Sequence, residues 1–265
     1  MYIYIYKYMK ICFISSLVGN NLNNIDKPGN FKKFHTDTFD FFLFTNIKDF
    51  KHDSWNVIHV EDSLLNEYAG ISENSDNRSD QIYKSRYFKF MGWDYIKNHL
   101  KKDYDVIFYC DAIYTPNHLT NWQYYVKKIL ESESGIIQKK HPKKNTIYSE
   151  CNAIIGCRKD SEENMKKMIE FFEKNNTPKD FVISENTSFG YNPNNKKITD
   201  AFSQLWKTYI TEKITYRDQP LWGYISHKND IKPCVINELH KCKDSTFNHL
   251  FIWNGKSFNR HRTYL

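Results

Sequence analysis

One carboxylate stands where a buried strand would deliver it to the edge of a sheet. Asp111 follows the apolar run Val106–Cys110, and the small residue Ala112 comes next. A carboxylate in that position can hold a divalent cation, which in turn neutralises a diphosphate. An aspartate there can instead cap a turn or the start of a helix near Pro116. Spacing alone leaves both roles open.

Two cations stand three residues apart in a stretch with helical periodicity. Arg86 and Lys89 would therefore share one face of a helix. Two cations beside a pocket at the end of a strand suit a pair of phosphates. The alternative is an ordinary solvated helix face, on which such residues are common.

Two further carboxylates are candidates for chemistry. Glu150 lies in an otherwise apolar segment and follows His141 and Pro142. A carboxylate flanked by apolar residues is either paired or functional. Asp218 precedes Pro220 and is typical of a helix N-cap with proline in the first turn. A helix N-terminus can also present a carboxylate to a ligand, so the two roles of Asp218 are compatible.

Histidine and cysteine give little support for a metal site made by the protein alone. Of the ten histidines, His249 and His261 stand out, because a ligand in the C-terminal tail could fold back over a pocket. The six cysteines form no C-x-x-C pair, and Cys12 and Cys110 lie in apolar runs where cysteine acts as a small hydrophobe. This pattern argues against a zinc site or a disulfide scaffold and favours a reducing compartment.

These candidates need a sheet to bring them together. Four apolar runs are typical of strands: residues 10–18, 39–44, 55–60 and 106–110. Residues 80–102 have helical periodicity, and strands that alternate with helices indicate an α/β fold with a mostly parallel sheet. Ligands of such sheets bind beyond the carboxyl ends of the strands. The segments expected to meet there are residues 15–21, 45–46 and 111–114.

The rest of the chain is predicted to continue this alternation. Helices are predicted over residues 116–130, 160–175, 199–212 and 218–228. Short strands are predicted over residues 135–137 and 146–155. The polar stretches 61–79 and 184–199 are predicted to be loops, and the tail after residue 230 is predicted to be irregular.

Composition and charge narrow the class of partner. The net charge of +7 favours anionic partners, although no block of five like charges occurs and a solvated surface explains the same balance. Aromatic residues make up 17% of the chain and could stack on bases in a nucleic-acid-binding module. They fall mainly on core-like periodicities, however, so nucleic acid is not the expected partner. The heavy use of Lys, Asn, Ile and Tyr is typical of an AT-rich genome.

Size and hydrophobicity favour one globular domain without a membrane span. The 265 residues suit a single α/β domain, and 40% of them are hydrophobic. No apolar run reaches the length of about 18 residues that a membrane span needs. We expect residues 1–9 to be an N-terminal extension and residues 10–265 to form one domain. Because the cysteine pattern argues against a disulfide scaffold, the protein is expected in the cytoplasm, in that of the host if it is viral.

The order of several motifs carries more information than any one of them. They are Ser16-Leu-Val-Gly19, Asp26-Lys-Pro28, Phe41-Phe-Leu-Phe-Thr-Asn46, Ser85-Arg-Tyr-Phe-Lys89, Tyr104-Asp105 with Asp111, His141-Pro142 with Tyr148-Ser-Glu150, and Trp206 with Tyr216-Arg-Asp-Gln219. In this order they resemble a family of GT-A-type glycosyltransferases with bacterial, plant mucilage and cell-wall, and large-virus members. The resemblance covers residues 10 to about 230.

The resemblance implies both a fold and a reaction. The fold would be a Rossmann-like, three-layer α/β/α sandwich around a mostly parallel sheet, with a nucleotide-binding half at residues 10–115. Residues 116–265 would form the acceptor half and the C-terminal tail. The reaction would move a sugar from a nucleotide-diphospho-sugar, a UDP-sugar, to a hydroxyl of a glycan or glycoprotein. Inversion or retention at the sugar carbon and the oligomeric state are left open.

The resemblance also implies a set of donor-binding residues. They are Ser16, Val18, Thr45, Arg86, Lys89, Asp111, Ala112 and Gln219. The first three would line the nucleotide base and ribose, and the two cations would steady the diphosphate. Asp111 would bind a divalent metal, manganese, or the ribose and phosphate of the donor.

The implied catalytic residues are Asp218 and Glu150. Asp218 would be the acceptor-side base or would orient the sugar, and Glu150 would contact the donor sugar or the acceptor. One departure from the family matters, because the usual Asp-x-Asp signature is Asp111-Ala-Ile113 here. Metal binding would then rest on Asp111, the diphosphate, water and His249. A catalytically degenerate GT-A scaffold is the alternative that this departure suggests.

Overall fold

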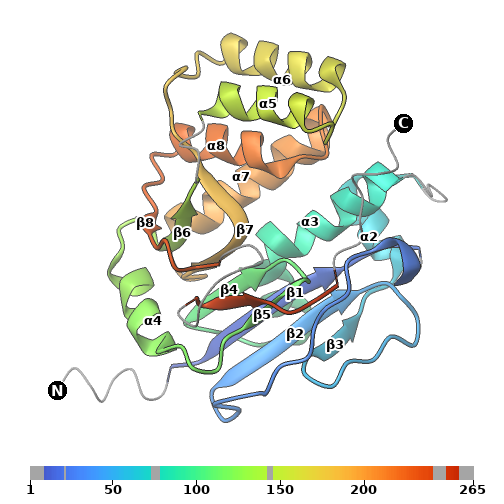
Figure 1. Cartoon of the computed structure of the whole chain (residues 1–265), viewed down its shortest axis with the longest axis vertical. Coiled ribbons are helices and arrows are strands. Elements are labelled where there is room, and N and C mark those ends of the chain that lie inside the picture. The colour runs from blue at the N-terminus through green and yellow to red at the C-terminus, as the bar shows by residue number, and fades with distance from the viewer. Residues whose placement is uncertain (1–8, 21, 73–77, 142–145, 241–248, 257–265) are drawn as a thin grey trace.

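A seven-stranded mixed sheet lies at the centre of the computed structural model, which describes residues 9–20, 22–72, 78–141, 146–240 and 249–256 (Figure 1). In sheet order its strands are β3 (Asn56–His59), β2 (Phe39–Thr45), β1 (Ile11–Leu17), β4 (Val106–Cys110), β7 (Ser184–Tyr191), β6 (Ile136–Lys140) and β8 (Cys234–Val235). β7 runs antiparallel to both of its neighbours, and the other ladders are parallel. The predicted α/β class with a mostly parallel sheet is confirmed.

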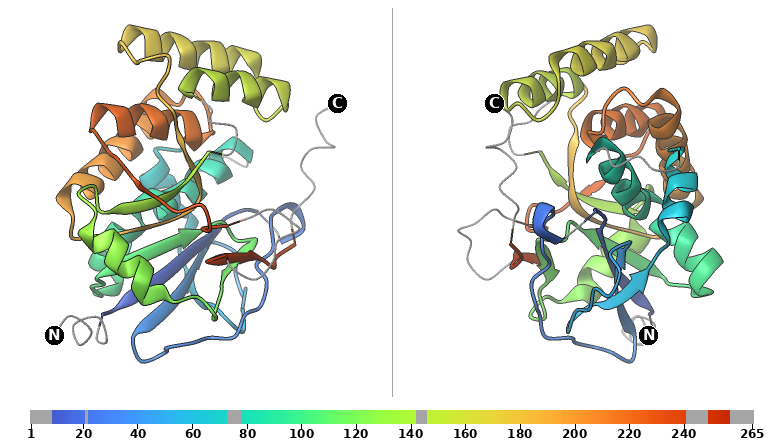
Figure 2. Two further views of the ribbon diagram at one scale, coloured as in Figure 1. Left: turned by 60° about the vertical axis from the view of Figure 1, so that its left-hand side comes forward. Right: turned by 90° about the vertical axis from the view of Figure 1, so that its right-hand side faces the viewer.

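Helices cover the sheet on both faces (Figures 1 and 2). They are α2 (Asp62–Ala69), α3 (Arg78–Tyr95), α4 (Trp122–Glu131), α5 (Ile147–Gly156), α6 (Glu162–Lys174), α7 (Lys196–Glu212) and α8 (Asp218–Lys228). η2 (Leu22–Asn24) is a short 3-10 helix and η3 (Ile96–Leu100) is a short π-helix that follows α3. β5 (Tyr114–Pro116) pairs with β9 (Phe251–Trp253) in a small second sheet. α3 and α7 cover one face, whereas α4 and the small sheet cover the other.

The two faces of the sheet bury separate apolar cores. Alternate residues of β1 point to opposite faces, so that Cys12 and Ile14 join one core and Ile11 and Phe13 join the other. The Phe13 ring stacks on other aromatic rings of its core, with centroids 5.1 Å from Phe41 and 5.3 Å from Phe108. Aromatic side chains of this kind are held in the core, where they are not available to stack on bases.

Two segments differ from their predicted state because residues at the helix ends stabilise helices there. Residues 62–69, predicted to be a loop, form α2, which ends at Gly70 in the left-handed conformation (φ 57°) that glycine adopts without strain. Residues 146–155, predicted to be a strand, form α5. A capping box joins the Thr146 and Ser149 side chains to each other's backbone N–H and starts this helix.

The segment 184–199, predicted to be a loop, contains the buried strand β7. Asn186 and Ser188 are almost fully buried but have side-chain partners, so their polarity does not exclude them from a central strand. The helix predicted from residue 116 begins later, at Trp122, where the Asn121 side chain accepts a hydrogen bond from Tyr124 N. Residues 114–116 belong to β5 instead.

The remaining predicted elements are confirmed with small shifts at their ends. These are the strands β1, β2, β3, β4 and β6 and the helices α3, α6, α7 and α8. Among the described residues, no helix has both the length and the apolarity needed to cross a membrane. Residues 1–8 of the expected extension at residues 1–9 lie outside the described residues, as do Cys242 and His261.

Candidate functional site

The carboxyl ends of β1, β2 and β4 meet at one edge of the sheet. β1 lies between β2 and β4, and the chain passes from β1 to β2 and β3 on one side before it returns to β4 on the other. The order therefore reverses between β1 and β4, and a crevice at such a switch point is where ligands of open α/β sheets bind. Ser15 Oγ donates to the Cys110 carbonyl at 2.8 Å, and Gly19 N donates to Asn46 Oδ1 at 3.0 Å. The predicted meeting of these segments is confirmed.

Asp111 lies at this edge, directly after β4. Its backbone N–H donates to the Thr187 carbonyl at 3.0 Å, which fixes the residue against β7. The buried Tyr109 hydroxyl donates to Asp111 Oδ1 at 2.9 Å. Burial, together with the charge of Asp111, raises the pKa of the Tyr109 phenol well above its usual value. The phenol therefore remains a proton donor, and it orients a carboxylate that is about one-third exposed.

α3 presents Arg86 and Lys89 to this carboxylate from one helical face, as predicted. Lys89 Nζ lies 3.8 Å from Asp111 Oδ1, and Arg86 Nη1 lies 3.9 Å from the same oxygen. Both cations make closer ion pairs with Asp218, at 2.9 Å from Lys89 to Oδ2 and 3.1 Å from Arg86 Nε to Oδ1. Two cations and two carboxylates from β4, α3 and α8 thus form one charge-balanced group, called the sheet-edge cluster below.

The sequence indicated that Asp218 is the N-cap of α8, but the structure shows that it is not. Arg217 occupies the cap position without a side-chain cap bond, and Asp218 is the first residue of the helix. Its carboxylate turns toward α3 instead, where ion pairs compensate its burial. The negative end of this side chain also gains from the helix N-terminus, although the two cations are closer partners.

Burial and pairing set the protonation states of the cluster. Burial raises the pKa of Asp218, but Arg86 and Lys89 outweigh it and hold the pKa well below its usual range. Burial lowers the pKa of Lys89, and the two carboxylates counter only part of that effect. For Arg86 the carboxylates outweigh burial, so its pKa is raised. At neutral pH Asp218 is therefore ionised and a weak base.

The depressed pKa of Asp218 predicts an acid-sensitive fold. Its stabilising contribution is fully present above the unfolded-state pKa of about 3.9 and is lost as the pH falls toward the lower folded-state value. We expect the free energy of unfolding, measured in urea, to fall between about pH 5 and pH 3. The free energy of unfolding of the Asp218→Asn variant should be lower than that of wild type at pH 7 and should fall less over this pH range. Parallel curves for the two proteins would contradict the assignment.

A bulge in β7 joins this cluster to the neighbouring strand. Gln138 of β6 pairs with Phe189, whereas Lys139 pairs with Glu185, so residues 186–188 of β7 have no separate partners in the register with β6. Bulges redirect side chains and are frequent beside functional sites. Here Asn186 Nδ2 donates to Asp218 Oδ2 at 3.3 Å, and Asn186 Oδ1 accepts from Gln138 Nε2 at 3.0 Å.

Gln219 supports the same bulge from α8. Its Oε1 accepts a hydrogen bond from Asn186 N at 3.1 Å, and its Nε2 donates to the Ser184 carbonyl. The side chain that the resemblance gave to the donor site therefore lies against β7, where it bonds to backbone. Gln219 and Asp218 together tie α8 to both β7 and α3.

A second group of charged residues lies at the same edge, on β6 and β7. Glu185 Oε2 lies 3.1 Å from His240 Nε2 and 3.5 Å from Lys139 Nζ. Lys139 Nζ also donates to the His240 carbonyl at 2.6 Å, and Ser188 Oγ shares a hydrogen bond of 2.7 Å with His240 Nδ1. Burial raises the pKa of Glu185, but His240, Lys139 and His141 outweigh it, so that the pKa lies below its usual value.

Glu150 lies beside this second group rather than among the apolar residues that the sequence suggested. It is in the first turn of α5, and its Oε2 lies 3.4 Å from His141 Nε2. His141 follows β6 directly, at the carboxyl end that faces the same edge as Asp111. The predicted motif of His141 and Glu150 is therefore brought together in space.

The residues assigned to the nucleotide base lie at the ends of β1 and β2. Ser16 Oγ donates to the Ser85 carbonyl of α3 at 3.1 Å. Thr45 is fully buried, and its Oγ1 accepts from Ile47 N at 3.1 Å. Val18 and Ala112 are also buried, with 7% and 6% of their surface exposed. These residues flank the switch point, but all except Ser16 reach solvent very little.

A metal site is not formed by the described residues alone. No group of three His, Cys, Asp or Glu side chains within the described ranges could hold an ion. His249 Nδ1 bonds to the Glu238 carbonyl at 3.0 Å. Ile113 stands where a second carboxylate would be, so Asp111 would contribute one carboxylate to a cation that prefers six or more oxygen ligands. A divalent ion fits here only with ligands that a substrate brings.

The C-terminal segment fixes the loop that follows Asp111. Asn254 N and Gly255 N both donate to the Ile113 carbonyl, at 3.0 and 2.9 Å. A Cβ on Gly255 would lie 2.3 Å from the Lys27 carbonyl oxygen and 2.7 Å from Ile113 Cα. Three backbone segments thus cross where only glycine fits, and the tail after residue 230 becomes part of the site's support.

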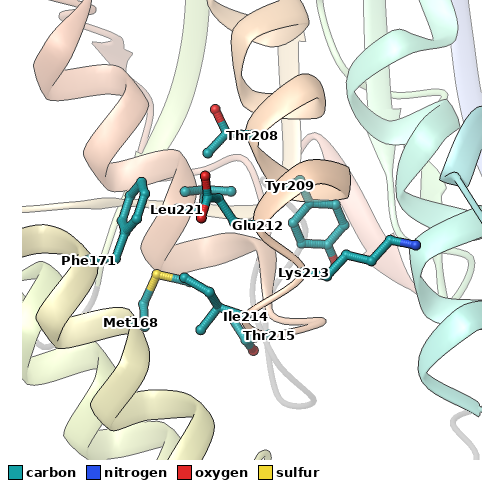
Figure 3. Close-up of a pocket in the computed structure, with 9 residues that line it drawn as sticks. All are labelled: Met168, Phe171, Thr208, Tyr209, Glu212, Lys213, Ile214, Thr215 and Leu221. Carbon is teal, nitrogen blue, oxygen red and sulfur yellow. The ribbon is translucent and has the colours of Figure 1, made fainter.

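A hollow of about 200 Å³ lies elsewhere, between α6, α7 and α8 (Figure 3). It is lined by Met168, Phe171, Thr208, Tyr209, Glu212, Lys213, Ile214, Thr215 and Leu221. This volume includes space that is open to solvent, so the hollow is not an enclosed ligand cavity. No residue of the sheet-edge cluster lines it, so we do not place the functional site there.

Several residues at the sheet edge were missed by sequence analysis. Tyr109 and Asn186 contact the cluster directly, and Lys139, Glu185 and His240 form the second group. Tyr109 lies in an apolar run, where a hydroxyl gives no signal of its partner. Asn186 and Glu185 lie in β7, a polar stretch whose residue pattern predicts a loop.

Fold and site together define the class: an α/β protein with a mixed, mostly parallel sheet and a charged cluster at its carboxyl edge. No protein-family model matches the chain, and no curated protein matches it. The structure is similar to the apo crystal structure of mouse xyloside xylosyltransferase 1, with a TM-score of 0.47 and 8% sequence identity over 92% of this chain and 97% of that chain. A likeness at this level carries no argument about family or reaction.

Proposed function

We propose that this protein is a GT-A-type glycosyltransferase that moves a sugar from a nucleotide-diphospho-sugar to an acceptor hydroxyl. A UDP-sugar is the proposed donor, and a glycan or glycoprotein is the proposed acceptor. One observation carries the proposal. Asp111, Arg86, Lys89 and Asp218 gather at the carboxyl edge beside the switch point between β1 and β4, which is where such sheets bind nucleotides.

In this proposal Arg86 and Lys89 bind the diphosphate. Negative charge grows on the leaving diphosphate during sugar transfer, and fixed cations in a partly buried site stabilise that charge strongly. Only 3% of the Lys89 side chain and 20% of the Arg86 side chain are exposed. Neither can relax far toward water, so both are preorganised for an anion that reaches them.

The donor's diphosphate would compete with Asp218 for the same two cations. Once phosphate oxygens take over Arg86 and Lys89, the pairs that depress the pKa of Asp218 weaken and its basicity rises. Asp218 would then deprotonate the acceptor hydroxyl if the enzyme inverts the sugar carbon. In a retaining enzyme Asp218 would instead orient the sugar, with Glu150 beside the acceptor.

Manganese enters the proposal only together with the donor. Asp111 would supply one carboxylate, and the diphosphate and water would supply the remaining oxygens, as is common for ions carried with phosphate substrates. The ion would add positive charge beside the phosphates. No further role is assigned to it, and the chemistry of this chain rests on the cations of α3.

A panel of nucleotide sugars tests the proposal. UDP-, GDP- and dTDP-sugars are added with and without manganese, and the melting temperature is measured. A ligand at about 100 times its Kd should raise the melting temperature by about 5–10 °C, because it stabilises only the folded state. The panel also identifies the base, since a single base should give the largest shift.

Three results would contradict or change the proposed function. No shift with any nucleotide sugar would contradict it. A shift without hydrolysis or transfer of the sugar would favour a catalytically degenerate scaffold. Stabilisation by oligonucleotides that weakens steeply with salt, and no response to nucleotide sugars, would favour a nucleic-acid-binding module.

A further inference from the structure

We propose that Glu185 and Lys139, with His141 beside them, form a subsite for the hydroxyl groups of a neutral sugar. The inference rests on the proposed function and extends it to residues to which the sequence gave no role in sugar binding. This subsite would contact the carbohydrate, whereas the sheet-edge cluster would bind the phosphates.

Topology places this subsite next to the sheet-edge cluster. β4 and β6 run in the same direction, on either side of the antiparallel β7, so Asp111 and His141 leave the sheet at the same edge. β7 begins at that edge, at Ser184 and Glu185. Two strand spacings, about 10 Å, separate β4 from β6. A diphosphate with a sugar bonded to it is long enough to reach from one group to the other.

The bulge of β7 connects the two halves of the edge. Asn186 contacts Asp218 of the sheet-edge cluster, whereas its neighbour Glu185 contacts Lys139 and His240. The consecutive residues Glu185 and Asn186 thus contact the two groups from opposite sides of one strand. A ligand that spans both groups would be contacted by one short segment of backbone.

The chemistry of the group favours a neutral, hydroxyl-rich ligand. One ammonium and one carboxylate face each other at 3.5 Å, and they compensate each other's charge. A sugar hydroxyl can donate to a carboxylate and accept from an ammonium, so a pair of this kind binds adjacent hydroxyls well. Both side chains retain some access to solvent, with 18% of Lys139 and 19% of Glu185 exposed.

Two buried polar atoms in the group lack a hydrogen bond within the described structure. They are Glu185 Oε2 and His141 Nδ1. Glu185 Oε2 still has His240 Nε2 at 3.1 Å and Lys139 Nζ at 3.5 Å as ion-pair partners. Such atoms are rare in native proteins and each requires an explanation. Donors and acceptors on a bound sugar would supply the missing bonds after small side-chain rotations.

The test compares Glu185→Gln and Lys139→Met with wild type in two binding measurements. The first is the affinity for UDP-glucose, UDP-galactose and UDP-xylose relative to UDP, by calorimetry. The second is binding of the free monosaccharides with and without saturating UDP, by saturation-transfer NMR. Each variant should lose about tenfold in affinity for the sugar-bearing ligand, while affinity for UDP changes less than twofold.

The two measurements separate the two sources of a sugar hydroxyl. A loss in the first assigns the subsite to the donor sugar, and a loss in the second assigns it to the acceptor. Unchanged affinity in both overturns the inference. If no nucleotide binds at all, the proposed function fails, but the free-monosaccharide measurement still decides the subsite.

A matched pair elsewhere controls for general effects of the substitutions. Glu133 and Lys197 lie 3.0 Å apart, on the segment after α4 and on α7. Glu133→Gln and Lys197→Met repeat the same chemical changes away from the edge and should leave every affinity unchanged. Glu185→Asp provides a second variant if Glu185→Gln folds poorly, because it keeps the charge and shortens the reach.

Discussion

Asp111→Asn should abolish the manganese-dependent part of UDP binding and lower sugar transfer by about 100-fold or more. The amide keeps the shape of the carboxylate and still accepts the Tyr109 hydroxyl, so the fold should survive. It loses the charge that holds a divalent ion, and even indirect changes around metal ligands cost about 10- to 100-fold in affinity. Calorimetry with UDP, with and without manganese, measures the effect.

The same variant gives an opposite result in the absence of metal. Asp111 lies 3.9 Å from Arg86 and 3.8 Å from Lys89, so in the proposed complex it would compete with phosphate for these two cations. Without this carboxylate the two cations should hold UDP as tightly as in wild type, or more tightly. Asp200→Asn, in an exposed pair on α7, is the control and should change neither measurement. Equal loss of UDP binding with and without manganese would contradict the role of Asp111 as an ion ligand.

Lys89→Met should lower the free energy of unfolding by about 3–5 kcal/mol. The substitution leaves the buried carboxylate of Asp218 short of its closest cation, and unpaired buried charges are costly. Asp218→Asn should cost a comparable amount, because it leaves two buried cations with one carboxylate. Urea unfolding at pH 7 measures both losses.

The double variant Lys89→Met/Asp218→Asn separates stability from function. Removing both partners leaves neither of them as an unpaired charge. The double variant should therefore lose less free energy of unfolding than the sum of the two single losses, by about 0.5–3 kcal/mol. It should nevertheless remain unable to bind UDP tightly, because one of the two phosphate-binding cations is gone. Strictly additive losses would show that the pair is not coupled. Retained UDP affinity would remove Lys89 from the donor site.

Much of the sheet could be predicted because its strands are apolar throughout. β1, β2 and β4 are buried on both faces, and strands of that kind stand out as continuous hydrophobic runs. Their parallel direction followed from the spacing between them, and the rule about carboxyl ends then selected Asp111 and the segments around it. Arg86 and Lys89 could be placed on one face because helical spacing alone determines that.

Elements whose polar residues are satisfied by distant partners could not be predicted. β7 carries Asn186 and Ser188 in the core, and their partners Gln138 and His240 lie about 50 residues away. Nothing within the strand indicates that these side chains would be hydrogen-bonded. The apolar pattern of α5 suits a strand as well as a helix, and the capping box of Thr146 decides in favour of the helix.

Local residue patterns are enough to predict the class of sheet and the edge at which its polar residues gather. They also indicate Asp111, Arg86, Lys89 and Asp218 as site residues. How these residues pair depends on the packing of the helices against the sheet. Whether Asp218 caps its own helix or neutralises cations on α3 depends on how α8 docks against α3. The second group, with Glu185 and Lys139, depends on a bulge in one strand. Ion pairs between distant segments are set by packing, which local residue patterns do not encode.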